Sequence, residues 1–443
     1  FQGQDMVGRT EALANVYDRM KAAGRKPLGG QNSNFWVVST QAPYEDYCMG
    51  APFGGSLKDG QIVTETNCHS NWWNGGPTRT GSVGIDTDKK LWIGEMSWKG
   101  TVKSDKWTSP SEFFQVNKYC NYGNEMALFN SYYNKTKPFQ TVETYQEDGQ
   151  TRYRLVEGQN TEVYLDLTEG SEWATNKDFT AVVKDVKKNA SGGVLGDYDL
   201  CLTGTGDYKA LLEQLEVGDV VTLNYGWTLY DGNITPNLTN LVSGNAVVMK
   251  NGELTGRNYD ESYNSMVYSR SAYGMSEDGK TLFMFVIDKS VDATYGSSAG
   301  CTTSVMCQIM KQLGAWNVVN VDAGGSAQLM VQGSVVNRTT ESYPRAVANG
   351  WMVYSTAPES STISRLEFLD AELSIPVYST YQPVILGYSE YGDLINENVE
   401  NFVLSCDPKI GTVENGVFYA GGEPGTGELK VECDGIVTTT TVN

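Results

Sequence analysis

The chain has 443 residues, of which 40% are hydrophobic and 19% are charged. That is the composition of a globular protein with room for two or three domains, and no apolar run approaches the roughly 18 residues of a membrane-spanning helix. With 33 basic and 53 acidic residues, the net charge of −20 argues against binding to nucleic acids or anionic membranes, because both need a basic surface.

Histidine and cysteine restrict the chemistry further. His69 is the only histidine, which excludes a histidine-rich zinc site and any mechanism that needs two histidines. The eight cysteines include no Cys-x-x-Cys pair, and such an even, scattered set is compatible with disulfides in an oxidising compartment and with reduced, buried thiols. The sequence begins at Phe1 without an initiator methionine or a signal peptide, and we expect an extracytoplasmic protein that is secreted, periplasmic or surface-attached.

In chain order, residues 10–23 form the first predicted helix, with Thr10 as its N-cap and Gly24 after its end, because apolar residues recur on one face. Most of the chain beyond this helix alternates like strands, and two more helices are predicted over 208–215 and 303–313. Strands with a few helices between them predict an α+β fold around a mixed β-sheet. Turn-forming pairs separate the strands, and these are Asp59-Gly60, Asp148-Gly149, Asn251-Gly252 and Asp278-Gly279.

Composition divides the chain into two predicted domains, 1–357 and 358–443. Serine, threonine, proline and glutamate cluster at this boundary, which is typical of a linker. Beyond it, short strands at regular spacing predict a small immunoglobulin-like β-sandwich with an accessory role, in which Cys406 and Cys433 could be bridged. Within the first domain, the stretch of about 94–178 is polar and aromatic without a clear period, and we expect an insertion or a subdomain there.

The best candidate for a functional site comes directly after the predicted strand 317–321. Asp322 stands at the end of this strand, and Gly324, Gly325 and Ser326 come soon after it. Glycines let a ligand approach the backbone closely, and successive N–H groups can bind an anion. The alternative is a tight turn that only joins two strands.

Two arginines, Arg270 and Arg345, lie in apolar, strand-like sequence. An arginine in such surroundings needs an anion, which is either a carboxylate of the protein or a bound phosphate. Asp288 comes after a hydrophobic strand and is either catalytic or a turn residue. His69, beside two tryptophans, either lines a sugar site or is a solitary surface histidine.

Short motifs succeed one another in a fixed order between Lys26 and Tyr354. They are Asn32-Ser-Asn-Phe-Trp36, Gly218-Asp-Val-Val221, Ser269-Arg-Ser-Ala-Tyr-Gly274, Phe285-Val-Ile-Asp288, Gly300-Cys-Thr302, Val321-Asp-Ala-Gly-Gly-Ser326, Asn337 and Arg345-Ala-Val-Ala-Asn349. Their order and spacing resemble the phosphodiester glycosidase family, whose human member removes N-acetylglucosamine from a mannose-6-phosphate diester. Ala323 stands where the family has a glycine, and Pro344 stands where it often has a glutamate.

The resemblance implies hydrolysis of the bond between a sugar anomeric carbon and a phosphate in an extracytoplasmic glycan or glycoconjugate. It implies that Asp322 is the acid/base or electrostatic carboxylate and that Asp288 or Glu341 is the second carboxylate. No cofactor is required, and a Ca²⁺ or Mg²⁺ ion at Asp322 is compatible with the sequence although no ligand spacing demands it. The residues that would hold the substrate and its phosphate are Asn32, Arg270, Thr302, Gly324, Gly325, Ser326, Asn337, Arg345 and Asn349.

Two other functions stay open. The same fold could serve a non-catalytic surface protein that binds a sugar phosphate or a glycan, and the two altered motif positions favour this interpretation. The intact arginines together with Asp322 and Ser326 favour the enzyme. A phosphodiesterase that does not act at a sugar carbon is the third interpretation, and analysis of the products would separate it from the glycosidase.

Overall fold

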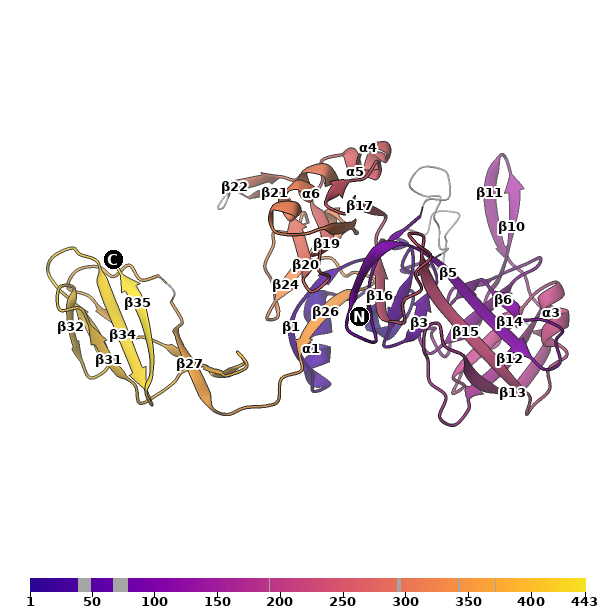
Figure 1. The fold of residues 1–443 in the computed structure, drawn as a ribbon, viewed down its shortest axis with the longest axis horizontal. Coiled ribbons are helices and arrows are strands. Elements are labelled where there is room, and N and C mark those ends of the chain that lie inside the picture. The colour runs from indigo at the N-terminus through magenta and orange to yellow at the C-terminus, as the bar shows by residue number, and fades with distance from the viewer. Residues whose placement is uncertain (39–48, 67–78, 191, 293–295, 342, 371) are drawn as a thin grey trace. The chain divides into compact units, whose positions relative to one another are not determined.

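The computed structural model describes residues 1–38, 49–66, 79–190, 192–292, 296–341, 343–370 and 372–443. The chain divides into two compact units, Phe1–Ser355 and Thr356–Asn443. Both are built mostly of strands, and every helix that is described belongs to the first unit, which is consistent with the predicted α+β class (Figure 1). No helix among the described residues is long and apolar enough to cross a membrane.

A sheet of 12 strands in the described part of the chain organises much of the first unit. On β12, Val163 and Leu165 join one hydrophobic cluster and Tyr164 joins another, which is the period of two that a sheet covered on both faces imposes. The strands in order across the sheet are β3 (Gln61–Thr64), β2 (Ser56–Lys58), β16 (Leu238–Ser243), β4 (Gly81–Asp86), β5 (Leu91–Ser104), β15 (Val220–Leu229), β13 (Phe179–Ala190), β12 (Asn160–Leu167), β14 (Leu200–Gly204), β9 (Met126–Asn130) and β7 (Gln115–Val116), with β6 (Ser111–Phe113) beside β5.

The stretch 94–178 is built into this sheet. It supplies β6, β7, β9, β12 and most of β5. A separate sheet in the same stretch is formed by β11 (Gln150–Leu155), β10 (Thr141–Glu147) and β8 (Cys120–Asn121), and the β10–β11 hairpin projects from the body of the unit (Figure 1). The helix predicted over 208–215 is α3 (Asp207–Leu212), which packs against β12 and β14.

A five-stranded sheet carries the strand that leads to Asp322. Its order is β18 (Glu253–Leu254), β17 (Ala246–Lys250), β23 (Asn317–Asn320), β19 (Arg270–Met275) and β20 (Leu282–Ile287). Helix α6 (Thr303–Gln312) packs Met306 and Met310 against one face, where Val318 lies, whereas Val319 faces the other side. The predicted strand 317–321 and the predicted helix 303–313 are therefore confirmed to within a residue of their ends.

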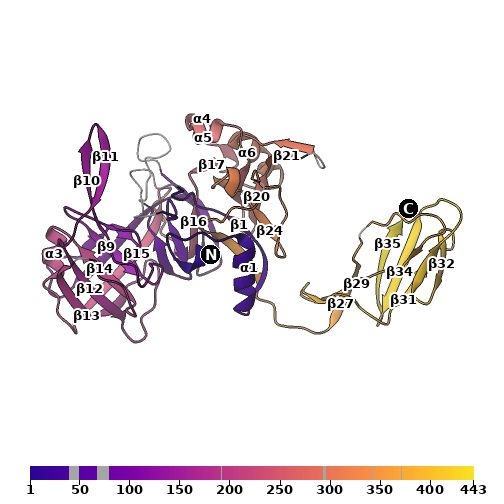
Figure 2. The same cartoon turned by 180° about the vertical axis from the view of Figure 1, so that it is seen from behind.

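A four-stranded sheet brings the beginning of the chain to the strands that come after Asp322. Its order is β25 (Ser334–Val335), β24 (Leu329–Val331), β1 (Lys26–Asn32) and β26 (Gly350–Ser355). Helix α1 (Leu13–Ala22) lies beside β1 in both views (Figures 1 and 2) and packs Leu13 and Val16 against Met330 and Met352.

The predicted N-cap of this helix is wrong. The helix begins at Leu13 after Ala12, which makes no side-chain cap, and not after Thr10. Glu11 exchanges two backbone hydrogen bonds with Val347, at 2.9 and 3.0 Å. This isolated β-bridge holds residue 11 in an extended conformation, so the helix cannot start before it.

The four predicted turn pairs all connect neighbouring antiparallel strands. They join β2 to β3, β10 to β11, β17 to β18 and β19 to β20. Asp59, Asp148 and Asn251 have φ between 50° and 51°, a conformation that aspartate, asparagine and glycine tolerate better than other residues. The local turn signals were therefore sufficient to predict these hairpins.

The second unit is all β, with its own buried core around Phe368, Ile385, Phe418 and Val431. Its three sheets are β27 (Ile363–Phe368), β29 (Ile385–Ser389) and β30 (Leu394–Asn396); β28 (Thr380–Tyr381), β33 (Val417–Ala420) and β32 (Gly411–Glu414); and β31 (Val403–Cys406), β34 (Gly427–Cys433) and β35 (Ile436–Val442).

Cys406 and Cys433, which the sequence allowed to be bridged, are not bridged, and all six described cysteines are free thiols. In the β31–β34 pair, Cys406 lies opposite Leu429 and Val403 lies opposite Glu432. The two cysteines therefore stand at opposite ends of the paired strands, too far apart for a disulfide. Cys48 and Cys68 lie outside the described residues.

Candidate active site

Asp322 lies just beyond the end of β23, where two sheets meet. Its N–H donates to the carbonyl of Ser33 at 2.8 Å, and its own carbonyl accepts from Nδ2 of Asn32 at 2.6 Å. The Oδ1 atom of Asn32 accepts from Oγ of Ser271 at 3.0 Å and from the N–H of Gln328 at 3.1 Å. The buried amide of Asn32 is thus engaged by the protein on both sides, and it positions the backbone that carries the carboxylate.

The carboxyl of Asp322 lies among protein atoms, although the residue as a whole keeps partial contact with solvent. Burial raises the pKa of Asp322 to about 7, while a hydrogen bond with Ser326, the charge of Arg345 and the backbone of Ala323 oppose the shift. The pKa depends on the surroundings of the carboxyl rather than on the exposure of the whole residue. A reachable carboxyl that changes protonation near neutral pH can both donate and accept a proton.

An ion pair lies directly over the glycine turn after Asp322. Nε of Arg345 donates to Oε2 of Glu341 at 3.1 Å, and Nη2 donates to Oε1. A Cβ atom on Gly325 would lie 2.6 Å from Nη2 of Arg345, so a side chain at this position would displace the ion pair. The remaining nitrogen, Nη1, faces Oγ of Ser326 at 3.5 Å. The predicted residues Ser326, Gly325, Arg345 and Glu341 are therefore neighbours of one another and of Asp322.

Two hydroxyl groups that the motifs did not indicate border the same turn. Oγ of Ser269 donates to the carbonyl of Gly324 at 3.0 Å, and Oγ1 of Thr340 reaches both Ser269 Oγ, at 3.1 Å, and that carbonyl, at 3.3 Å. Gly324 itself has φ of +65° and open space where a side chain would stand. Ser269 could have been found as the neighbour of Arg270 in its motif, whereas no local signal marks Thr340.

Arg270 is fully buried and is held by carbonyl oxygens. Nε donates to Cys301 at 3.0 Å, and Nη2 donates to Tyr263 at 2.8 Å, to Asn264 at 3.3 Å and to Met266. Burial lowers the pKa of Arg270, and no carboxylate among the described residues pairs with it. Its Nη1 atom has no hydrogen-bond partner within the described chain. Of the two alternatives for Arg270, a carboxylate partner is therefore not seen among the described residues, and one donor remains for an anion.

The ring of Tyr263, on the short helix α5 (Ser262–Ser265), connects Arg270 with Asp322. The guanidinium of Arg270 lies 5.1 Å from the centre of this ring. Burial raises the pKa of Tyr263 above its usual value, and so does the charge of Asp322, while a hydrogen bond with the backbone of Ala323 lowers it. The hydroxyl of Tyr263 therefore adjoins the turn that begins at Asp322, and it is a site residue that the motifs did not reveal.

Asp288 is engaged by a loop. Its Oδ1 atom accepts from Nδ2 of Asn337 at 3.0 Å, and Oδ2 accepts from the N–H of Arg338 at 2.9 Å. Asn337 also accepts from the N–H of Leu329 at 2.8 Å. Both residues thus fix the segment around β24, and no contact joins either of them to the carboxyl of Asp322 among the interactions of the described residues.

Two more predicted binding residues have clear structural contacts. Thr302 is the N-cap of α6, because its Oγ1 accepts from the N–H of Val305 at 3.3 Å. Asn349 is fully buried, accepts from the N–H of Asn34 at 2.9 Å and donates to Oγ of Ser56 at 3.3 Å. These contacts favour a role for both in holding the fold.

Among the described residues, no group of three or more histidine, cysteine, aspartate or glutamate side chains could hold a metal ion. A Ca²⁺ or Mg²⁺ ion at Asp322 would need further oxygen ligands from main-chain carbonyls or water. His69 lies outside the described residues.

Most of the residues around this turn lie in one part of the chain that is recognisable by sequence. Residues 169–354 match the phosphodiester glycosidase (NAGPA) family. The resemblance inferred from the motifs is thereby confirmed for this segment, which contains Arg270, Asp322 and Arg345, whereas Asn32 precedes it. No curated protein matches the sequence.

Solved structures extend the comparison from this phosphodiester glycosidase segment to the fold of the chain. A protein from Burkholderia pseudomallei proposed to be exported has a TM-score of 0.54 and 15% identity, over 80% of this chain and 70% of that one. A hypothetical protein from Synechocystis has a TM-score of 0.50 and 16% identity, over 78% of this chain and only 54% of that one. The catalytic domain of zebrafish N-acetylglucosamine-1-phosphodiester alpha-N-acetylglucosaminidase, auto-inhibited by its pro-peptide, scores 0.35 at 13% identity, over 79% of this chain and 68% of that one.

Proposed function

We propose that the first unit hydrolyses a sugar-1-phosphodiester, with Asp322 as the group that transfers the proton. The observation that carries this proposal is the setting of Asp322. Its carboxyl has a pKa of about 7, the residue as a whole keeps partial contact with solvent, and it adjoins a glycine turn flanked by Ser326 and Arg345. A carboxyl with a pKa near the working pH is the state that general acid catalysis needs.

The reaction transfers one proton from Asp322 to the leaving phosphate oxygen and one proton from water back to Asp322. The bond between the anomeric carbon and the phosphate oxygen breaks, its electron pair stays on that oxygen, and protonated Asp322 supplies the proton. Water then adds to the anomeric carbon, and its proton returns to the Asp322 carboxylate. One water is consumed, and the products are a free sugar and a phosphomonoester.

The phosphate would lie over the glycine turn. Nη1 of Arg345 is the nitrogen that the ion pair with Glu341 leaves available, and Oγ of Ser326 lies beside it. Backbone N–H groups of Gly324 and Gly325 would complete the contacts, since consecutive amides in such turns bind anions. Arginine suits this task because its planar donors match phosphate oxygens.

Turnover of N-acetylglucosamine-1-phosphate diesters by Asp322 variants tests the proposal. We expect Asp322→Asn to lose at least about a hundredfold in kcat, the contribution typical of a positioned acid or base. Asp18→Asn, an exposed aspartate on α1, is the matched control and should react like wild type. Normal turnover by Asp322→Asn would sink the proposed role.

A non-catalytic sugar-phosphate binder is the second candidate, and one observation favours it. Asp288 is engaged by Asn337 and Arg338, and Glu341 is paired with Arg345, so Asp322 is left without a free carboxylate partner from the predicted set. This candidate predicts that a sugar-1-phosphate binds without turnover and that Arg345→Ala weakens its binding.

We further propose that the protein works outside the cytoplasm and that residues 356–443 form an immunoglobulin-like accessory domain. The exported character proposed for the Burkholderia protein supports the first point. The all-β unit with its own core supports the second. Fractionation of the producing cells and an experimental structure of the second unit would test the two points separately.

A further inference from the structure

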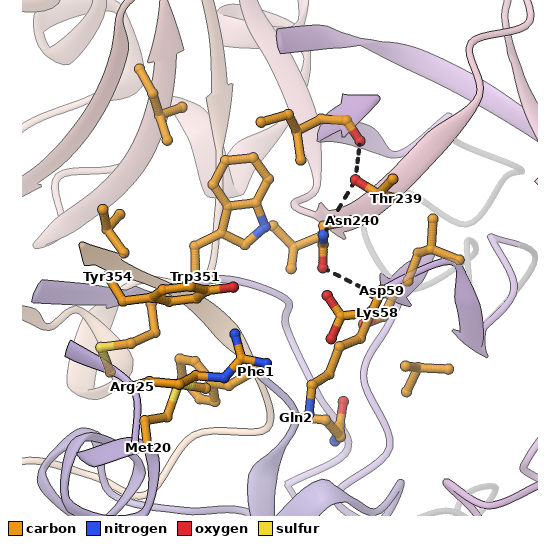
Figure 3. Close-up of a pocket in the computed structure, with 18 of the residues that line it drawn as sticks. Phe1, Gln2, Met20, Arg25, Lys58, Asp59, Thr239, Asn240, Trp351 and Tyr354 are labelled. Carbon is orange, nitrogen blue, oxygen red and sulfur yellow. Dashed lines mark hydrogen bonds between the residues drawn. The ribbon is translucent and has the colours of Figure 1, made fainter. Parts of the chain in front are cut away.

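A cavity of about 700 Å³ opens in the first unit, and none of its lining residues belongs to the site at Asp322. In Figure 3, Trp351, Tyr354 and Arg25 line one wall, and Lys58, Asp59 and Asn240 line the wall that faces it. Cavities of this size hold small molecules or short oligosaccharides. No step proposed for Asp322 uses it.

One wall offers aromatic faces. Trp351 and Tyr354 both come from β26, which is an edge strand paired only with β1 in the described chain. Trp351 contacts the ring of Tyr273, with ring centres 5.8 Å apart and an angle of 53° between the ring planes, and the guanidinium of Arg25 lies 4.7 Å from the ring centre of Tyr354. Aromatic rings that are packed on one side and open on the other suit stacking against the apolar face of a sugar ring.

The charge of the lining opposes that of the whole protein. Five cations and two carboxylates line the cavity, an excess of three positive charges (five minus two) in a chain with a net charge of −20. Arg19 and Lys58 pair with Asp5, at 2.5 and 2.7 Å. The remaining cations, Arg25, Lys89 and Lys280, form no ion pair with the described residues.

The three unpaired cations come from three separate places in the chain. Arg25 precedes β1, Lys89 lies in the turn between β4 and β5, and Lys280 lies in the turn between β19 and β20. Three cations without an ion pair match a ligand that carries more than one anionic group. On the facing wall, Asn240 Oδ1 accepts from the N–H of Asp59 at 3.1 Å (Figure 3), which fixes an amide for contact with hydroxyl groups.

We propose that this cavity binds an anionic oligosaccharide, with a sugar ring on Trp351 or Tyr354 and acidic groups on Arg25, Lys89 and Lys280. The acidic groups are carboxylates, sulfates or phosphates, which share the chemistry that these cations recognise. The binding site is separate from Asp322 and does not depend on the proposed hydrolysis.

Titration calorimetry at low ionic strength tests this with two charged probes, trigalacturonate and a sulfated chondroitin tetrasaccharide. Trigalacturonate carries carboxylates alone, whereas the chondroitin probe carries carboxylates and sulfates, so tighter binding of the second would show that sulfate groups contribute to recognition. Maltotriose is the neutral control, and sodium sulfate is the control for a free anion. We expect at least one charged oligosaccharide to bind about tenfold more tightly than either control, and to bind more weakly as salt is added.

Three substitutions in the cavity should each weaken the affinity for the charged probe that binds by about tenfold, which is the effect of losing one charge-assisted contact or one stacked ring. They are Arg25→Ala, Lys280→Ala and Tyr354→Ala, all at exposed positions where the fold tolerates truncation. Arg365→Ala is the matched control, because this arginine also lies over a tyrosine, at 4.1 Å, but in the second unit. It should bind like wild type, and so should Asp322→Asn.

Four results would overturn the proposal. They are no binding of either charged oligosaccharide, equal binding of maltotriose, equal binding of sodium sulfate, and binding that the three cavity variants leave unchanged. Since Asp322→Asn is expected to bind normally, loss of hydrolysis and loss of this binding are distinguishable.

Discussion

Asp322 and Glu65 show two ways in which a buried carboxylate is held in the first unit. Glu65 pairs with Lys118 at 2.5 Å, and both side chains are fully covered. Among the described residues Asp322 forms no ion pair, and the nearby Arg345 pairs with Glu341. Burial also raises the pKa of Glu125 to about 7, so a shifted pKa alone does not select Asp322. The adjoining glycine turn and the neighbouring hydrogen-bond donors distinguish Asp322 from Glu125.

The raised pKa of Asp322 predicts a specific pH dependence of stability. An unfolded aspartate releases its proton near pH 4, whereas the folded one holds it until about pH 7. The folded state therefore binds more protons between these values, and its stability falls as the pH rises from about 4 to about 7. Asp322→Asn has no proton to lose at this position. As the pH rises across this window, the free energy of unfolding of the variant should therefore increase relative to that of wild type, by at most about 4 kcal/mol.

Urea unfolding at pH 4.5 and pH 7.5 measures this gain. Asp18→Asn, at an exposed position, should differ from wild type by the same amount at both pH values. A difference between Asp322→Asn and wild type that does not change with pH would contradict the raised pKa of this carboxyl.

Arg270 predicts a loss of stability of a different kind. Its guanidinium donates to the carbonyls of Tyr263 and Met266, and a methionine in its place would remove these donors. The carbonyls of Asn264 and Cys301 would keep donors from Thr303 and Tyr268. Unpaired buried carbonyls cost about 1 to 3 kcal/mol each, partly offset by relief of the buried charge, and we expect Arg270→Met to lose about 2 to 4 kcal/mol in urea unfolding. Arg154→Met, at an exposed position, should lose less than about 1 kcal/mol. Equal losses for the two variants would contradict this role.

At the scale of elements, local signals predicted what local physics decides. The buried-strand pattern of 317–321 and the turn pairs were readable because each depends on neighbouring residues. The cap at Thr302 was not predicted, since this residue was expected to bind substrate. The start of α1 was not, since a bridge from Glu11 to Val347 decides it. The pairing of β1 with β24 and β26 joins segments some 300 residues apart, and no local pattern encodes such a choice.

The candidate site divides in the same way. Asp322, Ser326 and the glycines lie in one motif and were found, whereas Thr340 and Tyr263 reach the turn only through the folding of distant loops. Asn32 and Asn349 were found by their motifs, but their hydrogen bonds show that the same motifs also encode support for the backbone.

The glycine turn predicts an effect on activity larger than its effect on stability. A methyl group in Gly325→Ala would lie 2.6 Å from Nη2 of Arg345 and 2.7 Å from Oε1 of Glu341. Both are ends of flexible side chains, so the pair should move at a cost of about 1 kcal/mol or less. Turnover should fall at least about tenfold, because a donor to the phosphate is displaced.

Gly324→Ala separates displacement from strain. No atom lies within 4 Å of the added methyl group, but φ of +65° is unfavourable for alanine, which costs about 1 kcal/mol. We expect this variant to lose stability and to keep more turnover than Gly325→Ala. If Gly325→Ala instead kept more turnover than Gly324→Ala on the same diester, the present position of the Arg345–Glu341 ion pair would not be required for activity.

At the scale of the molecule, the two units have separate cores and no strand of one pairs into a sheet of the other among the described residues. We therefore expect residues 356–443 to fold alone, with strand-type circular dichroism and a cooperative unfolding transition. Residues 1–355 should keep full turnover. A disordered 356–443 fragment, or loss of turnover from 1–355, would contradict the independence of the units.

The central claim is that the first unit breaks the bond between a sugar carbon and a phosphate oxygen. Hydrolysis of an N-acetylglucosamine-1-phosphate diester in water labelled with heavy oxygen tests it most directly, with mass spectrometry of both products. We predict the label in the sugar, and at least about a hundredfold slower product formation by Asp322→Asn. Label in the phosphate would show that the bond is cleaved at phosphorus. Substrate that binds measurably but stays uncleaved would show a binding protein, and either result would contradict the claim.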